Sequence, residues 1–479
     1  MRTPARTIFS ALLVVLLSAA FSTLCAQSNS GLIGGTVTDP SGAVVPGATV
    51  SIENPVSKYS RTATTDKTGH FQFPNVPFNP YHLTVVMTGF GSVAQDVHVS
   101  STVPTNLDIP LQVSTASSTV TVESGEDLIE NDPTFHTDVD RDLSRKLPLE
   151  SQSSSLSSLV TLASPGVAGD SNGLFHGLGD HASNSFSLDG QPITDQQSKV
   201  FSNQIPSNSV QSLEVISGAP PAEYGGKTSL VINVTTRSGQ GLTKPVGNIT
   251  SSYGSFGSAT GSIDLGYGKQ NWGNFFELDG LNTGRFLDPP EFTVFHSKGN
   301  EQNLFDRIDD QFTPVDSVHL NVNYSRSWFQ TPNSYDNLRV SNVLSGGTGA
   351  NPVFGSVGDT DQRSKIETFD IAPTYTRIMG SNAVFNFGPY VRKDSYNYYP
   401  SGNPLADAGT QSQSISQARS LLNAGAHADV TVQKGNKSIK AGVVYQHTFL
   451  REHDRLGLVS ATFNSPCVDA SGNPQPGFT

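Results

Sequence analysis

The chain of 479 residues carries 41 acidic against 29 basic side chains, which gives a net charge of -12, and 35% of its residues are hydrophobic. This balance, without any run of Lys and Arg, disfavours nucleic-acid binding, because phosphate contacts require clustered cations. Beyond the N-terminus no apolar stretch approaches the roughly 20 residues that a membrane helix needs, so a membrane-spanning part would have to be built from strands.

Residues 1–26 are predicted to be a secretory signal peptide. Two arginines precede an apolar run from Ile8 to Phe21, a pattern that is typical of such peptides and too short for a spanning helix. Small residues place the cleavage after Ala26, and an uncleaved anchor is the alternative. Cleavage would remove Cys25 and leave Cys467 as the single cysteine, so no disulfide could form within the mature chain.

Residues 27–113 are predicted to form a β-sandwich, because short β-prone runs alternate with turn signals at sandwich spacing. The stretches Asp39 to Gly42 and Asp66 to Gly69 each place a turn-favouring Asp first and a glycine fourth, so both are predicted to be hairpin connections. The predicted strands are Gly35 to Thr38, Ala48 to Glu53, Arg61 to Thr65, His70 to Phe73, Tyr81 to Thr88, Ala94 to Val99 and Asn106 to Leu111.

Two stretches of this unit carry a resemblance to a known domain. They read GTVTDPSGAVVPGATVSI and TTDKTGHFQFPNVPFNPYHLTVVMTGF, and the unit resembles the carboxypeptidase regulatory-like domain. The resemblance implies a seven-stranded sandwich of carbohydrate-binding-like fold, a non-catalytic accessory domain that brings no zinc ligands. Sugar binding and a role as spacer or protein-docking module both stay open, because the matching residues make turns and fill the core.

Residues 114–125 are predicted to be a linker. The stretch STASSTVTVE is polar and ends in alternating, β-prone residues. Extended segments of this kind can add as a strand to the exposed sheet edge of a partner. A further strand of the sandwich and an ordinary linker are the alternatives. The residues that we single out for strand addition are Ser118, Thr119, Val120, Thr121 and Val122.

Residues 126–239 are predicted to form a mixed α/β domain. Helical patterns cover Leu143 to Leu149 and Leu156 to Leu162, and a Ser-Pro-Gly stretch stops the second. The run Ser185 to Leu188 leads into Asp189-Gly190, a strong two-residue hairpin signal. The alternating runs predicted as strands are Ser212 to Ile216 and Ser229 to Thr235.

The pieces of this domain follow one another in a specific order. The helical pattern before SPGV, SFSLDGQPI, SVQSLEVISGAPPAEYGG and LVINVTTRSG together resemble the plug domain of TonB-dependent outer-membrane receptors. Ser217 stands where the family often has arginine, and Ser229-Leu230 where it often has two glycines, which indicates the Oar-like branch, whose members also carry a regulatory-like domain in front. The residues that match the plug motif, expected to serve structure and not chemistry, are Asp189, Gly190, Gly218, Tyr224, Gly225 and Gly226.

The resemblance implies an outer-membrane receptor that binds an extracellular ligand and imports it with energy transmitted from the inner membrane. The plug and the N-terminal domain would lie on the periplasmic side, and residues 118–122 would be the TonB box, which pairs with TonB by strand addition. The expected partners are TonB, outer-membrane lipid and an unidentified extracellular ligand, with a glycan among the candidates. The alternatives are an Oar-like adhesion or surface-organising protein and a carbohydrate-binding surface protein.

Residues 240–479 are predicted to form part of an antiparallel membrane barrel. From Val318 to Ser325 apolar and polar side chains alternate, as a wall between lipid and water requires, although a soluble sandwich with one wet face alternates in the same way. The nine predicted strands are Val246 to Phe256, Ala259 to Gly268, Trp272 to Thr283, Gln302 to Phe312, Asp316 to Phe329, Glu367 to Ile378, Ala383 to Tyr398, Ser416 to Val432 and Lys437 to Leu450. Aromatic residues near strand ends, which indicate an interfacial girdle, are Trp272, Trp328, Phe329, Tyr396, Tyr398 and Tyr399.

The connections predict the direction of this barrel. Short turns follow the even-numbered strands, and most long links follow the odd-numbered ones. Outer-membrane barrels keep short turns on the periplasmic side, so the first strand should rise from a periplasmic plug. A single-chain bacterial barrel has an even number of strands, and a lumen that holds a plug needs about 22. We therefore expect the chain to be a C-terminally truncated fragment of a larger barrel.

The sequence offers no constellation for catalysis. His176 and His181 lie with Asp180 in a glycine-rich segment, but no further ligands stand at a recognised metal spacing. The stretch Arg451 to Asp454 lacks the second histidine of a metalloprotease helix, and no glycine-flanked serine marks a nucleophile. No enzyme activity, catalytic residue, metal or cofactor is therefore predicted.

Overall fold

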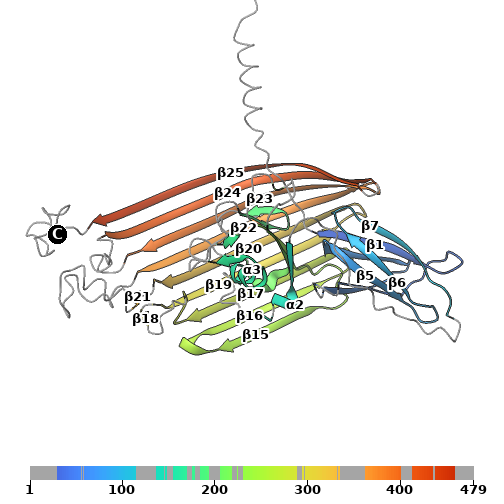
Figure 1. Ribbon diagram of the computed structural model, residues 1–479, viewed down its shortest axis with the longest axis horizontal. Helices are drawn as coiled ribbons and strands as arrows, with labels where there is room; N and C mark the ends of the chain where they lie inside the picture. Colours follow the sequence, from blue (N-terminus) through green and yellow to red (C-terminus); the bar gives the residue numbers. More distant parts are fainter. Residues whose placement is uncertain are drawn as a thin grey trace, which may run out of the picture.

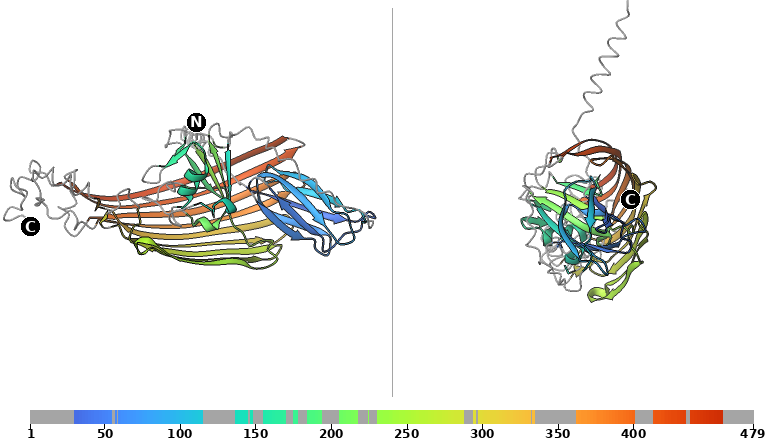
Figure 2. Two further views of the ribbon diagram at one scale, coloured as in Figure 1. Left: turned by 60° about the horizontal axis from the view of Figure 1, so that its bottom comes forward. Right: turned by 90° about the vertical axis from the view of Figure 1, so that its right-hand side faces the viewer.

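The chain folds into a long curved sheet with a small β-sandwich at one end and a mixed α/β domain on its concave side (Figures 1 and 2). We call these the wall (residues 246–458), the sandwich (30–114) and the plug (136–237). The computed structural model describes residues 30–54, 57, 59–114, 136–144, 146–147, 155–169, 175–177, 184–193, 205–217, 224, 230–287, 294–295, 297–331, 333–334, 362–400, 413–434 and 437–458. The predicted signal peptide and the candidate TonB box lie outside these residues. Among the described residues no helix is long and apolar enough to cross a membrane.

The sandwich consists of two sheets with the strand orders β4-β1-β7 and β3-β2-β5-β6. Inward side chains form a single core, in which Ile33, Phe71, Phe73 and Tyr81 are at most 1% exposed. Each of the predicted β runs is a strand, so the seven-stranded sandwich is confirmed for the described residues. The strands are β1 (Ser30–Thr38), β2 (Thr49–Glu53), β3 (Ser60–Thr64), β4 (His70–Pro77), β5 (Asn79–Val86), β6 (Val93–Val99) and β7 (Thr105–Pro110).

Both predicted turns from Asp to Gly are formed in the sandwich. In the second, Asp66 Oδ1 accepts the backbone N–H groups of Thr68 at 2.8 Å and His70 at 3.0 Å, and Gly69 has a φ of 72°. A residue without a Cβ adopts this φ at no steric cost, which is why glycine ends the turn. The turn that begins at Asp39 is built in the same way.

The plug is a five-stranded sheet of order β12-β11-β14-β13-β8, against which one helix packs. Leu156, Leu159 and Val160 of helix α3 are buried against apolar residues of the sheet. The elements are β8 (His136–Asp140), α2 (Arg141–Ser144), α3 (Ser155–Ala163), β9 (Val167–Gly169), β10 (Phe175–Gly177), β11 (Ser185–Leu188), β12 (Gln191–Ile193), the 3₁₀ turn η2 (Ser207–Ser209), β13 (Val210–Ser217) and β14 (Leu230–Thr236).

Two elements of the plug differ from the prediction. The pattern over Leu143 to Leu149 predicts a helix, but α2 spans only Arg141–Ser144. Pro148 has no backbone N–H and disfavours helical geometry at the residue before it, so a helix cannot continue through the predicted range. β8 is not predicted, because its sequence HTDVD holds a single apolar residue and therefore no apolar alternation.

The wall is an antiparallel sheet, nine-stranded in the described part of the chain, in which each strand pairs with its neighbours in chain order. All nine predicted strands are present. The strands are β15 (Val246–Tyr253), β16 (Ala259–Gly268), β17 (Trp272–Thr283), β19 (Gly299–Gln311), β20 (Asp316–Gln330), β22 (Arg363–Met379), β23 (Ala383–Tyr399), β24 (Gln413–Lys434) and β25 (Lys437–Leu458). The 3₁₀ turn η4 (Ser255–Gly257) joins the first two strands, and β18 (Val294–Phe295) pairs with β21 (Asn333–Ser334).

The two faces of the wall are inverted relative to those of a soluble sheet. Along β20, Asn321, Asn323 and Ser325 on the concave face are at most 1% exposed, whereas Tyr324 on the convex face is 40% exposed. The predicted alternation is therefore present, with its polar side on the concave face, which is the face on which the plug lies (Figure 2). A soluble sandwich buries its apolar face, so this distribution contradicts that alternative.

The predicted aromatic girdle is wrong for two of its members. Phe329 and Tyr396 are 1% and 7% exposed and pack together with Ile366 on the concave side. The period of two along a strand explains this, because Phe329 follows the inward-facing Ser325 by an even number of residues. Tyr399 lies three residues after Tyr396 on β23, so its side chain is on the opposite, convex face, where it is 40% exposed.

Gly35 on β1 is expected to tolerate no side chain. A Cβ there would lie 2.1 Å from the carbonyl oxygen of Leu107 on β7, whereas a Cβ at Gly34 would lie 3.4 Å from its nearest neighbour. Gly35→Ala should therefore push β1 and β7 apart and lower the free energy of unfolding by about 1–3 kcal/mol, as overpacking does, with Gly34→Ala as the matched, near-neutral control. Urea unfolding of the purified chain, read out by hydrogen exchange in β1 and β7, measures the difference, and equal stabilities would contradict the close approach.

Candidate functional site

The turn between β11 and β12 carries Asp189 and Gly190, the strongest hairpin signal of the plug. Their φ values are 47° and 85°, in the left-handed region that a two-residue hairpin of type I′ requires. Asp tolerates this region better than most residues, and glycine adopts it freely. The backbone N–H of Asp189 donates to Val234 O of β14 at 2.9 Å. The turn thereby holds a carboxylate toward the wall.

Arg307 of β19 receives this carboxylate, and its side chain is 1% exposed. Its Nη1 lies 3.2 Å from Asp189 Oδ2, and the Thr236 hydroxyl bridges the pair, accepting from Arg307 at 2.8 Å and donating to Asp189 at 2.6 Å. Nε and Nη2 donate to Asp309 at 2.8 to 3.1 Å. Nη2 also donates to Asn75 Oδ1 of the sandwich at 2.9 Å. All three guanidinium nitrogens are hydrogen-bonded, so the buried cation is compensated on every side.

The same hairpin reaches two further wall strands. Asn321 of β20 donates to Asp189 Oδ2 at 2.6 Å, and Gln191 of β12 donates to Asp370 of β22 at 2.8 Å. Gln191 and Asp370 are 2% and 1% exposed. One plug hairpin is thus held by three neighbouring wall strands through buried polar contacts.

A second contact between plug and wall has the opposite charge pattern. Arg237, which follows β14, places Nη1 2.8 Å from Asp264 of β16 and its Cζ 4.1 Å from the centre of the Phe275 ring. Arg141 of α2 approaches the same carboxylate at 3.7 Å. Here the plug supplies cations and the wall an anion, whereas at Arg307 the signs are reversed. This reciprocal pattern favours one placement of the plug, because a shifted plug would bring like charges together.

The segment from Thr236 to Gly241 carries the chain from the plug into the wall and is held on several sides. Ser238 Oγ donates to Asp309 at 2.6 Å, and the N–H of Gly241 donates to Lys269 O at 2.8 Å. At Gly239 a Cβ would lie 2.2 Å from a wall carbonyl oxygen. A residue without a side chain is therefore needed for the chain to pass the wall at this point.

Of the remaining residues of the predicted plug motif, the structure describes Tyr224. Tyr224 is 7% exposed, and its hydroxyl accepts a hydrogen bond from Asn233 Nδ2 of β14 at 2.6 Å. It packs with Ile216 and Val231, which places it inside the plug. The residues that lie outside the described part of the chain are Gly218, Gly225, Gly226 and the candidate TonB box Ser118, Thr119, Val120, Thr121 and Val122.

Sequence reasoning missed Arg307 and Asp309, which together with Asp189 form the centre of the contact. The sequence does hold one signal for them. Arg307 and Asp309 are two residues apart on a strand and therefore share a face, and on the concave face a buried charge needs a partner. Nothing in the pattern names that partner, because Asp189 lies 118 positions earlier in the chain.

A metal site is not formed by the described residues, among which no three or more His, Cys, Asp or Glu side chains are grouped to hold an ion. His176 lies on the short strand β10, whereas Asp180 and His181 lie outside the described residues. The chemistry that the described contact supports is ion pairing and hydrogen bonding.

Asp189 is the ionisable plug residue at the centre of the contact. Burial raises its pKa, but the charge of Arg307 and the hydrogen bonds from Thr236 outweigh burial and hold the pKa of Asp189 below its usual value of 3.8. A carboxyl whose pKa is lowered by folding stabilises the folded state above its unfolded pKa of about 4. Asp189 is therefore ionised in the contact at neutral pH.

Asp189→Asn is expected to weaken the contact while it preserves the turn. Asn tolerates a positive φ, but its neutral amide cannot balance Arg307, and removal of one partner from a buried ion pair costs about 3–5 kcal/mol. Asp310→Asn on the exposed face of β19 is the matched control, expected within about 0.5 kcal/mol of the wild type. Urea unfolding of the plug measures both variants, and an equal loss in the two would remove the role assigned to Asp189.

The contribution of Asp189 to stability should disappear in acid. Because folding lowers its pKa, the stabilisation is fully present above about pH 4 and is lost as the pH falls through the folded pKa. The difference in thermal unfolding midpoint between the wild type and Asp189→Asn should therefore be largest near neutral pH and shrink below about pH 4. A difference that stays constant down to about pH 2 would mean that the charge of Asp189 contributes nothing.

Two parts of the sequence match family models. Residues 33–112 match the carboxypeptidase regulatory-like domain, and residues 132–229 match the TonB-dependent receptor plug domain. No match is found among curated proteins. Both domain resemblances predicted from the sequence are confirmed, whereas the Oar-like branch stays a prediction.

The chain is similar to solved structures of receptors. A structure of FpvA from Pseudomonas aeruginosa bound to heterologous pyoverdines is 12% identical, with a TM-score of 0.50, and the match covers 68% of this chain and 43% of that one. The ferric yersiniabactin uptake receptor FyuA from Yersinia pestis is 13% identical, with a TM-score of 0.49 and coverage of 68% of this chain and 50% of that one. The chain thus spans half or less of the length of these structures.

The match of the plug domain and the structural match are to receptors, in agreement with the non-enzymatic role predicted from the sequence. The chain carries a carboxypeptidase regulatory-like domain and the plug domain of the TonB-dependent receptors, and it has the fold of these receptors.

Proposed function

We propose that the chain acts as a TonB-dependent receptor that binds an extracellular ligand and imports it across the outer membrane. The observation that carries the proposal is the inverted wall, with a buried polar face around the plug and an exposed apolar face. Lipid covers such an apolar band, whereas a water-soluble protein would have to leave it in contact with water. Its exposed apolar residues include Ile263, Leu278, Ile308, Tyr324, Phe369 and Phe387.

The position of the sandwich supports a direction for this receptor. The sandwich lies at one end of the wall (Figure 1), where a cavity of about 550 Å³ is lined by Gln72 and by Asn271 and Thr313 of two short turns. Outer-membrane barrels keep their short turns on the periplasmic side. We therefore place the sandwich and the plug toward the periplasm and the opposite end of the wall toward the outside.

The candidate TonB box, residues 118–122, precedes β8 in the chain. β8 stands at the end of the plug sheet and pairs with β13 over Ser212 to Ile216. A pull on the box would load β8 first among the described strands of the plug, and a strand that pairs with a single neighbouring strand separates at lower cost than a central one. In the proposed mechanism, force from the inner membrane separates this strand and then loosens the contacts of Asp189 and Arg237 with the wall.

A peptide that covers residues 114–135 is expected to bind the periplasmic domain of TonB by strand addition. Val120→Pro removes a backbone N–H within the box and should weaken binding by about tenfold or more. Ala116→Pro, in the same linker but outside the box, is the control. Titration calorimetry measures the affinities, and an unchanged affinity for Val120→Pro would remove the assignment of the box.

In cells, deletion of residues 118–122 should abolish uptake that depends on the proton gradient and leave ligand binding at the surface intact. Ferric siderophores, vitamins, glycans and peptides are the ligand classes to supply in labelled form. Uptake that is unchanged by the deletion would contradict the transport mechanism. Loss of cell adhesion with no uptake of any class would favour the surface-organising alternative of the Oar-like branch.

A further inference from the structure

The sandwich reaches the plug–wall contact through a side chain that an irregularity of its own sheet positions. The pairing of β4 with β1 shifts register between Gly31 and Ile33, and Asn75 lies opposite this shift with a φ of 54°. Bulges of this kind re-aim a side chain, and a positive φ outside glycine carries a local cost that the surrounding structure must offset. From this position Asn75 Oδ1 accepts a hydrogen bond from Arg307 Nη2 at 2.9 Å.

A second sandwich residue holds the bulge against the same junction. Arg61 of β3 donates from Nη1 to the carbonyl oxygen of Pro74, which precedes Asn75, and from Nη2 to Gln240 O at 3.0 Å. Gln240 belongs to the segment that joins the plug to the wall. Both contacts therefore couple the placement of the bulge to the placement of the plug.

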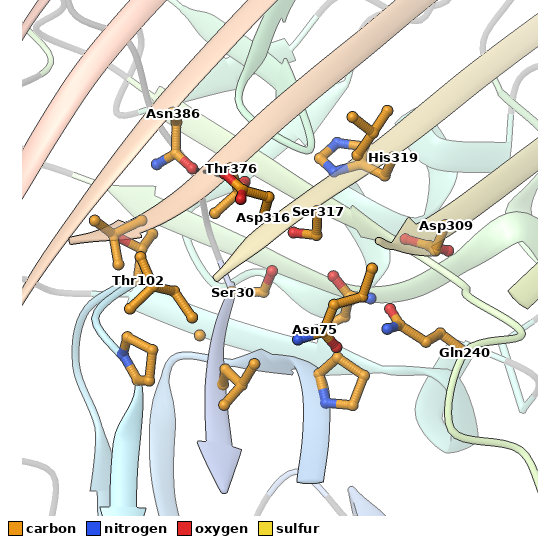
Figure 3. A pocket seen from close by; sticks show the side chains of 18 of the residues that line it. Ser30, Asn75, Thr102, Gln240, Asp309, Asp316, Ser317, His319, Thr376 and Asn386 are labelled. Atoms are coloured by element: carbon orange, nitrogen blue, oxygen red, sulfur yellow. Dashed lines mark hydrogen bonds between the residues drawn. The ribbon is translucent and has the colours of Figure 1, made fainter. Parts of the chain in front are cut away.

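The remainder of the seam between sandwich and wall is loosely packed and lined by both polar and apolar side chains. A cavity of about 100 Å³ separates them, and Figure 3 shows Asn75 and Gln240 beside Asp309 in its lining. The seam also includes hydrogen bonds of 3.3 Å from Gln72 to Gln311 and from Ser101 to Gln433. Domains of one chain move relative to each other unless their interface is large and hydrophobic, so a loosely packed seam of mixed polarity can open without unfolding either side.

We propose that the sandwich is a latch on the closed plug. When it is docked, Asn75 completes the hydrogen bonding of Arg307 and so stabilises the ion pair of Arg307 with Asp189, and when it parts from the wall this ion pair weakens. Asn75 is a positioning residue, because it acts through Arg307. Coupling of this kind is reciprocal, so a loosened plug must also weaken the docking of the sandwich. The proposal rests on the geometry of the contact and not on transport, so either can fail alone.

The first test compares variants of the full chain by hydrogen exchange at the Thr236 amide, which donates to Asp189 Oδ1 at 2.9 Å. Asn75→Gly removes the side-chain amide and keeps the positive φ, Asn75→Asp keeps an acceptor for Arg307, and Gln72→Ala breaks a seam contact that does not reach Arg307. Asn75→Gly should exchange about tenfold faster than Gln72→Ala, as expected for the loss of a hydrogen bond to a buried charge, and Asn75→Asp should restore slow exchange. Equal exchange in Asn75→Gly and Gln72→Ala would overturn the proposal.

The second test uses the reciprocal direction and leaves Asn75 intact. Ser101 is 8% exposed beside the wall, so a thiol in Ser101→Cys, in a Cys467→Ser background, reacts with a labelling reagent when the sandwich undocks. Adding Asp189→Asn should accelerate labelling of the thiol by about the same factor by which Asn75→Gly accelerates exchange at the Thr236 amide, because the coupling is reciprocal. Identical labelling rates with and without Asp189→Asn would show that the two contacts are independent and that the sandwich is no latch.

Discussion

The folded arrangement of three domains depends on one buried cation. Arg307 belongs to the wall, yet its hydrogen-bond acceptors come from the plug, the wall and the sandwich, at Asp189, Asp309 and Asn75. A guanidinium withdrawn from water is tolerated only when its donors are satisfied, so each domain supplies part of what the others need. The docking of the plug and that of the sandwich are thereby linked through this side chain, in addition to the contacts of Arg61 with Gln240 and of Asn79 with Asp138, although the two domains fold around their own apolar cores.

The polarity of the wall explains why ions and amides, and not apolar packing, hold the plug. A strand that faces lipid on one side has its polar residues on the other, and the concave face must be polar wherever water or a plug fills the lumen. The plug therefore meets Asn, Asp, Arg and Ser side chains. Such contacts are directional, and their charge pattern favours a single placement of the plug in the wall, because Asp264 of the wall pairs with Arg237 of the plug and Arg307 of the wall pairs with Asp189 of the plug. Each contact can also exchange its partner for water, which a dry apolar interface cannot do, and a closure of this kind is compatible with repeated opening.

Most of the fold could be predicted because its signals are long or ordered. Strands of the wall alternate over enough residues that phase and boundaries are both recognisable, and the plug was recognised from several short pieces in a fixed order. The failures have local causes. The helical pattern around Leu143 includes a proline, which disfavours a helix, and β8 holds a single apolar residue. Phe329 and Tyr396 are of the residue type of a girdle, but their phase along the strand places them inside. The contact itself could not be predicted, because Arg307 and Asp189 are joined by tertiary geometry across 118 positions.

Asp189 shows why a correct local explanation can conceal a second role. Its position before Gly190 is accounted for by the hairpin turn, since a short polar residue at positive φ is what that turn requires. Asn or Gly would satisfy the backbone equally well, and neither could neutralise Arg307. The hairpin therefore does not explain why this position holds a carboxylate, whereas the ion pair with Arg307 does. The geometry of the ion pair depends in its own right on the left-handed backbone, which aims the side chain of Asp189 at the wall. The turn and the charge are thus two requirements on one residue, and only their combination selects Asp.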